Sequence, residues 1–206
     1  MTEDEARAAT RAIVGDLAFE KLERFAASVI AESEQQNLVA KPTLAAIWSR
    51  HLLDSAQLLP LATANDGLWV DVGTGAGFPG LVVALATERP VILVEPRRMR
   101  ADFLQQIVDD HAIADRVTVA RCKIERLANV TAAVISARAV SSVTSLIDAT
   151  AQIAHSSTLY LLPKGQSATT EVNDARRRFE GLFHVEQSIT DPASGIITAS
   201  GVRRRR

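Results

Sequence analysis

Short apolar runs alternate with helical stretches from residue 68 onward, and no other feature of the chain constrains the fold as strongly. Each run is apolar throughout rather than at every second position, as in strands that are covered on both faces of a sheet. Strands that alternate with helices form parallel, doubly wound sheets. We therefore predict a mainly parallel α/β sheet with helices on both faces. The predicted strands are Leu68–Val72, Val91–Val94, Val117–Ala120, Ala133–Ala137 and Leu159–Leu162.

Helices are also predicted before the first strand. Residues 4–36 carry apolar side chains at helical spacing, and no Gly or Pro interrupts them after Gly15. We expect one long helix over about 16–35. A further helix is expected to start at Lys41-Pro42-Thr43 and to continue to Pro60.

The length of the chain fits one domain with a substantial core, since 47% of its 206 residues are apolar. We expect an N-terminal helical extension, residues 1–60, to pack on an α/β core of residues 66–206. The other expected elements are the helices Gly80–Thr87, Arg98–His111, Val143–Ala154 and Thr169–Phe179, and two weaker strands, His184–Ile189 and Ile196–Ala199.

Several features indicate a cytoplasmic protein. No apolar run approaches the roughly 20 residues that a helix needs to cross a bilayer. The chain begins MTEDEARAAT, which is acidic, whereas a secretory signal begins with positive charge and an apolar segment. The one cysteine, Cys122, excludes an internal disulfide and suits a reducing compartment.

The net charge is −1, but the positive charges are clustered. A local cluster binds phosphates even on a nearly neutral protein, because salt screens distant charges. Each cluster has two interpretations, a phosphate-binding patch or a solvated helix face. The clusters are Arg97, Arg98 and Arg100; Arg121, Lys123 and Arg126; Arg176 to Arg178; and Arg203 to Arg206.

The first predicted strand runs directly into a glycine-rich loop, in the segment WVDVGTGAGFPG at 69–80. Gly73 and Gly75 allow the main chain to approach a ligand closely, and the next helix offers unpaired N–H groups. The second strand ends at Glu95, whose carboxylate can accept hydrogen bonds from both hydroxyls of a ribose. Ligands of doubly wound sheets bind at the carboxyl ends of the strands. The loop therefore predicts a site for a ribose-containing cofactor.

Three interpretations of this loop compete. Dinucleotide loops follow G-x-G-x-x-G, whereas this one follows G-x-G-x-G and continues with Phe78 and Pro79. Asp71, two residues before the first glycine, would repel a pyrophosphate but would accept a hydrogen bond from an ammonium group. We therefore favour S-adenosylmethionine, and hence a methyltransferase, over a nucleotide dehydrogenase. The third interpretation is a tight turn that binds no ligand.

Motifs along residues 20–166 resemble those of the RsmG (GidB) methyltransferases and occur in the same order. These enzymes methylate N7 of a guanine in 16S ribosomal RNA of the small subunit. The resemblance implies a Rossmann-like class I fold, S-adenosylmethionine as cofactor, and small-subunit ribosomal RNA or the ribosomal subunit as partner. The motifs are NLVA at 37–40, WSRHLLDS at 48–55, VDVGTGAGFPG at 70–80, EPRRMRADFLQQ at 95–106, VISARA at 134–139 and LPKG at 162–165.

Carried over position by position, the resemblance implies cofactor contacts from Gly73, Phe78, Ile124, Glu125 and Arg138. We expect the Phe78 ring to pack against the cofactor, and Ile124 and Glu125 to lie beside the adenine. Asp71, Gly75 and Glu95 complete the set of candidate cofactor-binding residues.

The expected reaction leaves the catalytic residues unassigned. N7 of guanine already carries a free lone pair, so no general base is required. The four histidines are scattered, and no metal-ligand spacing is present, so we expect no metal. Arg50 and Lys164 are the candidates: Arg50 lies where Asp54 can pair with it or with His51 on a helix, and Lys164 borders a guanine pocket.

Two other functions remain open at this point. The near-neutral net charge favours a small-molecule methyltransferase. A catalytically silent cofactor-binding module that contacts ribosomal RNA is equally compatible, because N7 methylation needs no base whose absence would reveal inactivity. We expect a monomer. The modified guanine, and the choice between naked RNA and an assembled subunit, are not specified by the sequence.

Overall fold

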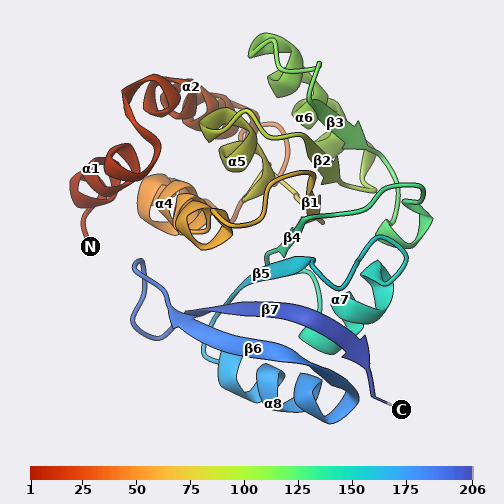
Figure 1. Cartoon of the computed structure of the whole chain (residues 1–206). Coiled ribbons are helices and arrows are strands. Elements are labelled where there is room, and N and C mark those ends of the chain that lie inside the picture. The colour runs from red at the N-terminus through yellow and green to blue at the C-terminus, as the bar shows by residue number, and fades with distance from the viewer. Residues whose placement is uncertain (206) are drawn as a thin grey trace.

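The computed structural model describes residues 1–205, and its strands form one seven-stranded sheet (Figure 1). The strands are β1 (Trp69–Val72), β2 (Val91–Val94), β3 (Val117–Ala120), β4 (Val134–Ala137), β5 (Leu159–Lys164), β6 (Phe179–Gln187) and β7 (Gly195–Arg204). Their order is β3-β2-β1-β4-β5-β7-β6. β1 to β5 pair in parallel, whereas β7 runs antiparallel to β5 and β6. The predicted mainly parallel α/β fold is confirmed.

Helices cover both faces of the sheet, and each face has its own apolar core (Figure 1). The helices are α2 (Asp16–Glu32), α5 (Gly80–Ala86), α6 (Arg98–Asp110), α7 (Val143–Thr150) and α8 (Ala168–Arg178). Trp69 and Leu93 pack in the cluster that contains α2, α5 and α6. Val70 and Val94 pack in the cluster that contains α7 and α8. Successive strand residues thus face opposite cores, which explains why the runs are apolar throughout.

The N-terminal helices pack on this core. α1 (Glu3–Val14) begins with a capping box, in which the Thr2 hydroxyl accepts from the Glu5 N–H and the Glu5 carboxylate accepts from the Thr2 N–H. Phe25 of α2 is fully buried in the same cluster as Leu81 of α5. That residues 1–206 unfold as a single domain stays a prediction.

The prediction of one continuous helix from Lys41 to Pro60 is wrong. The chain forms α3 (Lys41–Leu44), the π-helix η1 (Trp48–Leu52), α4 (Leu53–Ala56) and the 3-10 helix η2 (Leu59–Ala62) instead. The π-helix is closed by the N–H of Leu53, which donates to the carbonyl of Trp48. Apolar spacing does not distinguish this wider turn from an α-helix. π turns occur frequently at functional sites.

The prediction for the C-terminal segment is wrong in one detail, because Phe179 leaves the helix and begins β6. Its ring is buried in the core and its backbone is extended, with φ −124° and ψ 148°. β6 and β7 are also longer than the two predicted strands. Gly181, at φ +147°, lies at an irregularity in their pairing between Glu180 and Leu182.

A carboxylate from α1 caps the π-helix. Glu3 accepts hydrogen bonds from the N–H groups of Trp48 (2.9 Å) and Ser49 (3.0 Å) and from the Ser49 hydroxyl (2.7 Å). The Trp48 ring stacks on Phe19 of α2, with 4.9 Å between the ring centroids. The first two helices therefore hold the π-helix in place.

We predict that Glu3→Ala lowers the free energy of unfolding by about 1–3 kcal/mol, because it leaves two N–H groups of the π-helix without an acceptor. Urea unfolding followed by circular dichroism measures the change. Glu20→Ala is the matched control, since Glu20 is exposed on α2, and it should change stability by no more than about 0.5 kcal/mol. Equal losses in the two variants would contradict the capping role.

Candidate functional site

The loop between β1 and α5 adopts backbone conformations that favour glycine. Gly73, Gly75 and Gly77 have φ angles of +65°, +61° and +99°. The packing is tightest at Gly80, where an added Cβ would collide with the Leu93 side chain and would lie 2.8 Å from the Asp71 carboxylate. The glycines thus let the chain turn sharply at the carboxyl end of β1.

Asp71, in β1, stabilises this turn through hydrogen bonds. The side chain is fully buried, and its carboxylate accepts hydrogen bonds from the Gly80 N–H (2.9 Å) and from the Ser136 hydroxyl (2.6 Å). Ser136 in turn accepts from the indole N–H of Trp69 at 2.8 Å. Burial raises the pKa of Asp71 to about 6, although these hydrogen bonds oppose the rise. Both carboxylate oxygens accept hydrogen bonds from protein groups, so Asp71 fixes the glycine loop in place. We had expected its carboxylate to contact a ligand.

Glu95 lies beside the glycine loop, at the end of β2. Its side chain is 3% exposed, and the carboxylate accepts from the N–H groups of Gly75 (3.1 Å) and Arg97 (2.9 Å). The structure therefore brings together the glycines and the acidic residue that the sequence placed at two strand ends. A Cβ added to Gly75 would meet only the end of the Arg100 side chain, at 3.6 Å, and the carbonyl of Gly73. This open cradle beside a carboxylate fits a ribose-containing cofactor.

The remaining cofactor candidates surround the same edge of the sheet. Ile124 and Glu125 begin the 3-10 helix η3 (Ile124–Arg126) that follows β3; Ile124 is buried and Glu125 is exposed. Val140, in the loop after β4, lies against Gly73. A Cβ added to Gly73 would be 2.7 Å from Cγ2 of Val140. The loop after β4 therefore covers part of the glycine loop.

The Phe78 ring, which we expected to face the cofactor, packs inside the protein instead. It is 3% exposed and lies between the rings of Phe25 (5.2 Å between centroids) and His51 (5.0 Å). Phe25 comes from α2 and His51 from the π-helix. The ring of Phe78 thus joins the glycine loop to the N-terminal helices.

Arg138, just after β4, is held by the WSRHLLDS segment. Its guanidinium donates to the carbonyl of Arg50 (3.1 Å), to the carboxylate of Asp54 (3.3 Å) and to Nδ1 of His51 (2.9 Å). Burial lowers the pKa of Arg138, and the charge of Asp54 opposes that effect. The prediction that Asp54 pairs with Arg50 or His51 is wrong, because the π turn changes the direction of their side chains and Asp54 pairs with Arg138.

His51 is neutral in this network. Burial and the charges of Arg138 and Arg50 lower its pKa to about 3. Because a guanidinium can only donate, Nδ1 of His51 accepts and Nε2 carries the proton. Nε2 therefore donates to the hydroxyl of Thr43, at 2.8 Å.

The two candidate catalytic residues differ in their surroundings. The Arg50 side chain is 53% exposed, with Nη1 3.7 Å from the Asp191 carboxylate. Lys164 is 12% exposed; its ammonium donates to the carbonyl of Ser141 (2.6 Å) and pairs with Glu171 (3.0 Å). Arg50 is free to meet a ligand, whereas Lys164 fixes the loop after β4.

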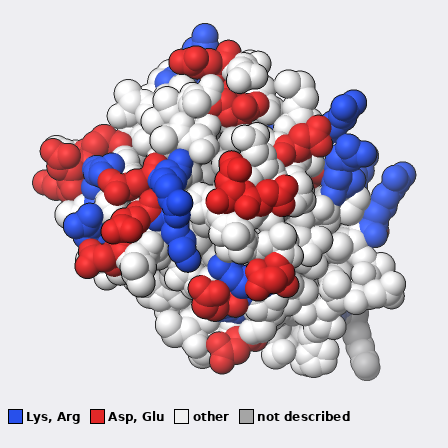
Figure 2. Space-filling view, turned by 90° about the horizontal axis from the view of Figure 1, so that it is seen from above, with Lys and Arg blue, Asp and Glu red and all other residues white. Residues whose placement is uncertain are grey.

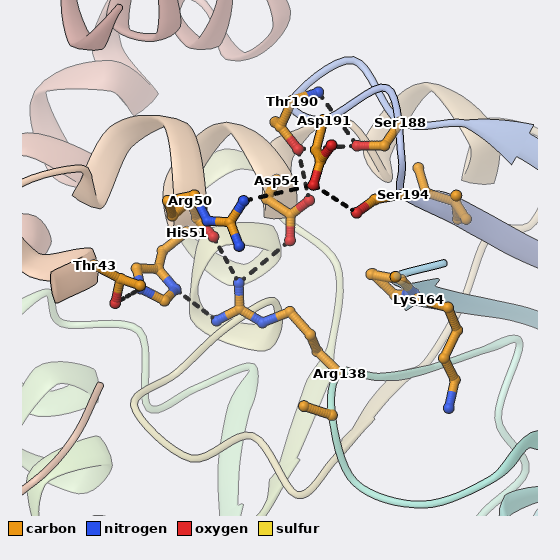
Figure 3. Close-up of a pocket in the computed structure, with 15 residues that line it drawn as sticks. Thr43, Arg50, His51, Asp54, Arg138, Lys164, Ser188, Thr190, Asp191 and Ser194 are labelled. Carbon is orange, nitrogen blue, oxygen red and sulfur yellow. Dashed lines mark hydrogen bonds and ion pairs between the residues drawn. The ribbon is translucent and has the colours of Figure 1, made fainter. Parts of the chain in front are cut away.

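A polar pocket of about 370 Å³ opens between the π-helix, the end of β5 and the loop that joins β6 to β7 (Figure 3). Arg50, Asp54 and Arg138 line it together with Lys164 and Asp191. Arg138 and Lys164, at the ends of β4 and β5, thus line one pocket, and their roles in binding or catalysis stay predictions. The remaining lining residues are Thr43, His51, Ala139, Pro163, Gly165, Ser188, Thr190, Ser194, Gly195 and Ile196.

The sequence analysis missed the contribution of the β6–β7 loop, residues 188–194. Asp-Pro followed by Gly, at 191–195, is a turn signal that predicts a hairpin here. It does not reveal that the loop packs on the WSRHLLDS segment. Two side chains hold the loop there: Asp54 of that segment accepts from the Thr190 hydroxyl (3.1 Å), and the side-chain amide oxygen of the nearby Gln57 accepts from the Ile189 N–H (2.9 Å).

Two of the basic clusters lie at the carboxyl edge of the sheet, after β2 and after β3. Arg97 and Lys123, one from each, are exposed. In Figure 2, Lys and Arg gather at the right, the side on which α6 and β3 lie in Figure 1. In the C-terminal cluster, Arg203 pairs with Glu180 (2.7 Å) and Arg204 with Asp148 (2.9 Å); Arg178, from the cluster before it, also contacts Asp148 (2.8 Å). Arg206 lies outside the described residues.

Over residues 1–205, no group of three or more His, Cys, Asp and Glu side chains is arranged to hold a metal ion. No helix in that range is both long and apolar enough to cross a membrane.

We predict that Asp71 makes the stability of the protein fall as the pH rises from about 4 to about 7. The unfolded carboxyl loses its proton near pH 3.8, whereas the buried one keeps it to about pH 6, so the folded state binds more protons in this window. Relative to Asp71→Asn, the wild type should lose about 3 kcal/mol across it. Urea midpoints at several pH values measure the difference. Parallel curves for the two proteins would contradict it.

Comparisons with known proteins agree with this geometry. A sequence model of the GidB family, described as rRNA small subunit methyltransferase G, matches residues 18–194. The Ribosomal RNA small subunit methyltransferase G of Sphingopyxis alaskensis is 50% identical over 182 residues, which cover 88% of this chain and 78% of that protein. The protein of the same name from Rhizorhabdus wittichii is 44% identical over 207 residues, which cover 100% of this chain and 95% of that protein.

Solved structures share the fold at low sequence identity. A methyltransferase from Geobacter sulfurreducens has a TM-score of 0.58 and 13% identity, covering 86% of this chain and 88% of that one. P. horikoshii TYW2 in complex with MeSAdo has a TM-score of 0.56 and 15% identity, and the match covers 75% of this chain and 62% of that one. These likenesses confirm the Rossmann-like methyltransferase fold. The resemblance of the motifs is confirmed as well, and the chain belongs to the GidB family of rRNA small subunit methyltransferases.

Proposed function

We propose that this protein transfers the methyl group of S-adenosylmethionine to N7 of a guanine in 16S ribosomal RNA. The observation that carries the proposal is the position of Arg138, which lines the polar pocket and follows β4 at the edge where the glycine loop and Glu95 lie. A cofactor on that edge and a base in the pocket would meet at Arg138. Membership of the GidB family supports this reading over a nucleotide dehydrogenase.

The residues that would hold the cofactor surround the open cradle at Gly75. Glu95 would accept from the ribose hydroxyls, and the main chain at Gly73 and Gly75 would approach the ligand closely. Ile124 and Glu125 would flank the adenine, one with an apolar surface and the other with an acceptor. When bound, S-adenosylmethionine supplies a methyl group on a positively charged sulfur, and this edge offers carboxylates suited to a cation.

The task of the chain is then to hold the guanine in line with the methyl group. N7 attacks through its own lone pair, so no side chain has to remove a proton. The rate enhancement comes from alignment and from stabilising the positive charge that spreads into the purine. Asp54 and Asp191 bring negative charge to a pocket that Arg50, Arg138 and Lys164 also line, and the neutral His51 adds no further positive charge.

The RNA itself would be held by the exposed basic side chains at the same edge, including Arg97 and Lys123. Each phosphate contact steepens the plot of the logarithm of the binding constant against the logarithm of salt concentration by about one unit of slope or slightly less. A paired guanine must leave its helix before it can enter a pocket. Two further proposals accompany this function, a cytoplasmic location and a monomeric state.

Labelled S-adenosylmethionine and small ribosomal subunits from cells that lack the activity test the function. The label should appear at N7 of one guanine of 16S RNA, and naked 16S RNA in parallel shows which form is the substrate. Label on small molecules alone would favour a small-molecule methyltransferase. Tight cofactor binding without transfer to any acceptor would favour a silent RNA-contacting module.

We predict that Arg50→Ala lowers the rate of methyl transfer at least tenfold, because Arg50 is the exposed cation at the pocket. The protein should stay folded, since half of the side chain is in solvent and its ion pair with Asp191 is long. Arg24→Ala is the matched control, because Arg24 is an exposed arginine on α2, and it should leave turnover unchanged. Unchanged turnover in Arg50→Ala would show that Arg50 only supports the helix.

A further inference from the structure

Among the described residues that line the pocket, two carry carboxylates, Asp54 and Asp191. Asp54 is 17% exposed and accepts from Arg138 (3.3 Å), from the Thr190 hydroxyl (3.1 Å) and from the Gln57 amide (2.9 Å). These three donors engage both oxygens of Asp54. Asp191 has only two such donors and is 33% exposed, so its carboxylate is the one better placed to meet a bound molecule.

The hairpin turn fixes the direction of the Asp191 side chain, but it does not occupy every hydrogen-bond acceptor site of the carboxylate. The carboxylate accepts from the Ala193 N–H (2.9 Å) and from the Ser194 hydroxyl (3.0 Å). A carboxylate has sites for about four hydrogen bonds, so two stay open. The nearest nitrogen of Arg50, at 3.7 Å, is too far for a hydrogen bond. The two bonds within the turn lower the pKa of Asp191, so the group is ionised at neutral pH.

The hairpin holds Asp191 at the end of the pocket away from the predicted cofactor edge. The Ile189 N–H donates to Gln57 and the Thr190 hydroxyl donates to Asp54, so the residues just before Asp191 are attached to the N-terminal segment. In the close-up, Arg138 and Asp191 lie on either side of Asp54 (Figure 3). A base that lies in the pocket alongside Asp54 would have one edge toward Arg138 and the opposite edge toward Asp191.

Guanine carries its hydrogen-bond donors on the edge opposite N7. N1–H and the N2 amino group lie side by side there, and one carboxylate can accept from both, as it does from a guanidinium. If N7 points toward the cofactor edge, these donors point toward the hairpin. Adenine has an acceptor at N1, which a carboxylate repels. A carboxylate in this position also stabilises the positive charge of the methylated purine.

We propose that Asp191 recognises the target guanine by accepting hydrogen bonds from its N1–H and N2 amino groups. This role rests on the proposed function, because it identifies the specificity-determining residue of the same pocket. Asp191 thereby selects guanine over adenine and orients N7 toward the methyl donor.

Inosine provides the direct test, since it differs from guanosine only by lacking the N2 amino group. Small subunits are reconstituted with guanosine or inosine at the mapped position, and kcat/KM for methyl transfer is measured with each. The wild type should prefer guanosine by about tenfold or more. Asp191→Asn should lower kcat/KM on guanosine at least tenfold and reduce the preference to less than about twofold. Asn can still accept from the Ala193 N–H, so the turn should persist.

Asp174→Asn is the matched control, because Asp174 is an exposed residue of α8 that does not line the pocket, and it should retain both the rate and the preference. A full preference for guanosine in Asp191→Asn, at any rate, would overturn the role of Asp191 and leave the proposed function intact. A wild type that methylates guanosine and inosine equally would do the same. A wild type that methylates neither substrate would overturn the proposed function and this role together.

Discussion

The hydrogen bonds around the guanidinium of Arg138 join the parts of this structure that matter for its site. The charge is largely buried, at a position where an unpaired guanidinium would be costly. Asp54, the neutral His51 and the carbonyl of Arg50 supply its acceptors, and all three come from the WSRHLLDS segment. Removing one partner of a buried ion pair costs about 3–5 kcal/mol in other proteins. The end of β4 is therefore tied to a segment that precedes the sheet.

The same segment also reaches the C-terminal hairpin. One oxygen of Asp54 accepts from Arg138 and the other from Thr190, so a single carboxylate contacts both the sheet and the β6–β7 loop. Phe78 adds a second connection, because its ring packs on His51 beside the glycine loop. The N-terminal helices thus contribute walls of the pocket. This arrangement explains why a chain of this fold needs residues far apart in sequence to complete one site.

Much of the fold was predictable because it depends on local patterns. Apolar runs of strand length gave the five parallel strands, and the glycine spacing gave a sharp turn whose neighbour, Glu95, is in contact with Gly75 as expected. The family motifs also pointed to the edge of the sheet where the glycine loop, Glu95 and Arg138 lie. These signals are short in range, or they depend on the rule that parallel strands end at one edge.

The features that sequence reasoning missed depend on tertiary contacts. The π turn at Trp48–Leu52 is favoured by the Glu3 carboxylate, which comes from another helix. That turn redirects Asp54 toward Arg138. The sequence makes Asp71 a candidate for ligand contact, yet Gly80 and Ser136 engage its carboxylate inside the protein, and no periodicity in the sequence shows those contacts. Likewise, a turn signal at Asp191 does not say which surface the hairpin covers.

Asp54 couples Arg138 to the hairpin through its two oxygens, and a double-mutant cycle between Asp54 and the hairpin tests this coupling. Asp54→Asn, Thr190→Val and the double variant are compared by kcat/KM for methyl transfer to small subunits, with circular dichroism to establish folding. If the Asp54 carboxylate and the Thr190 hydroxyl act together, the losses in kcat/KM should be non-additive. The double variant should then be about as active as the less active of the two single variants. Losses that simply add would show that Asp54 and Thr190 act independently and would contradict the claim.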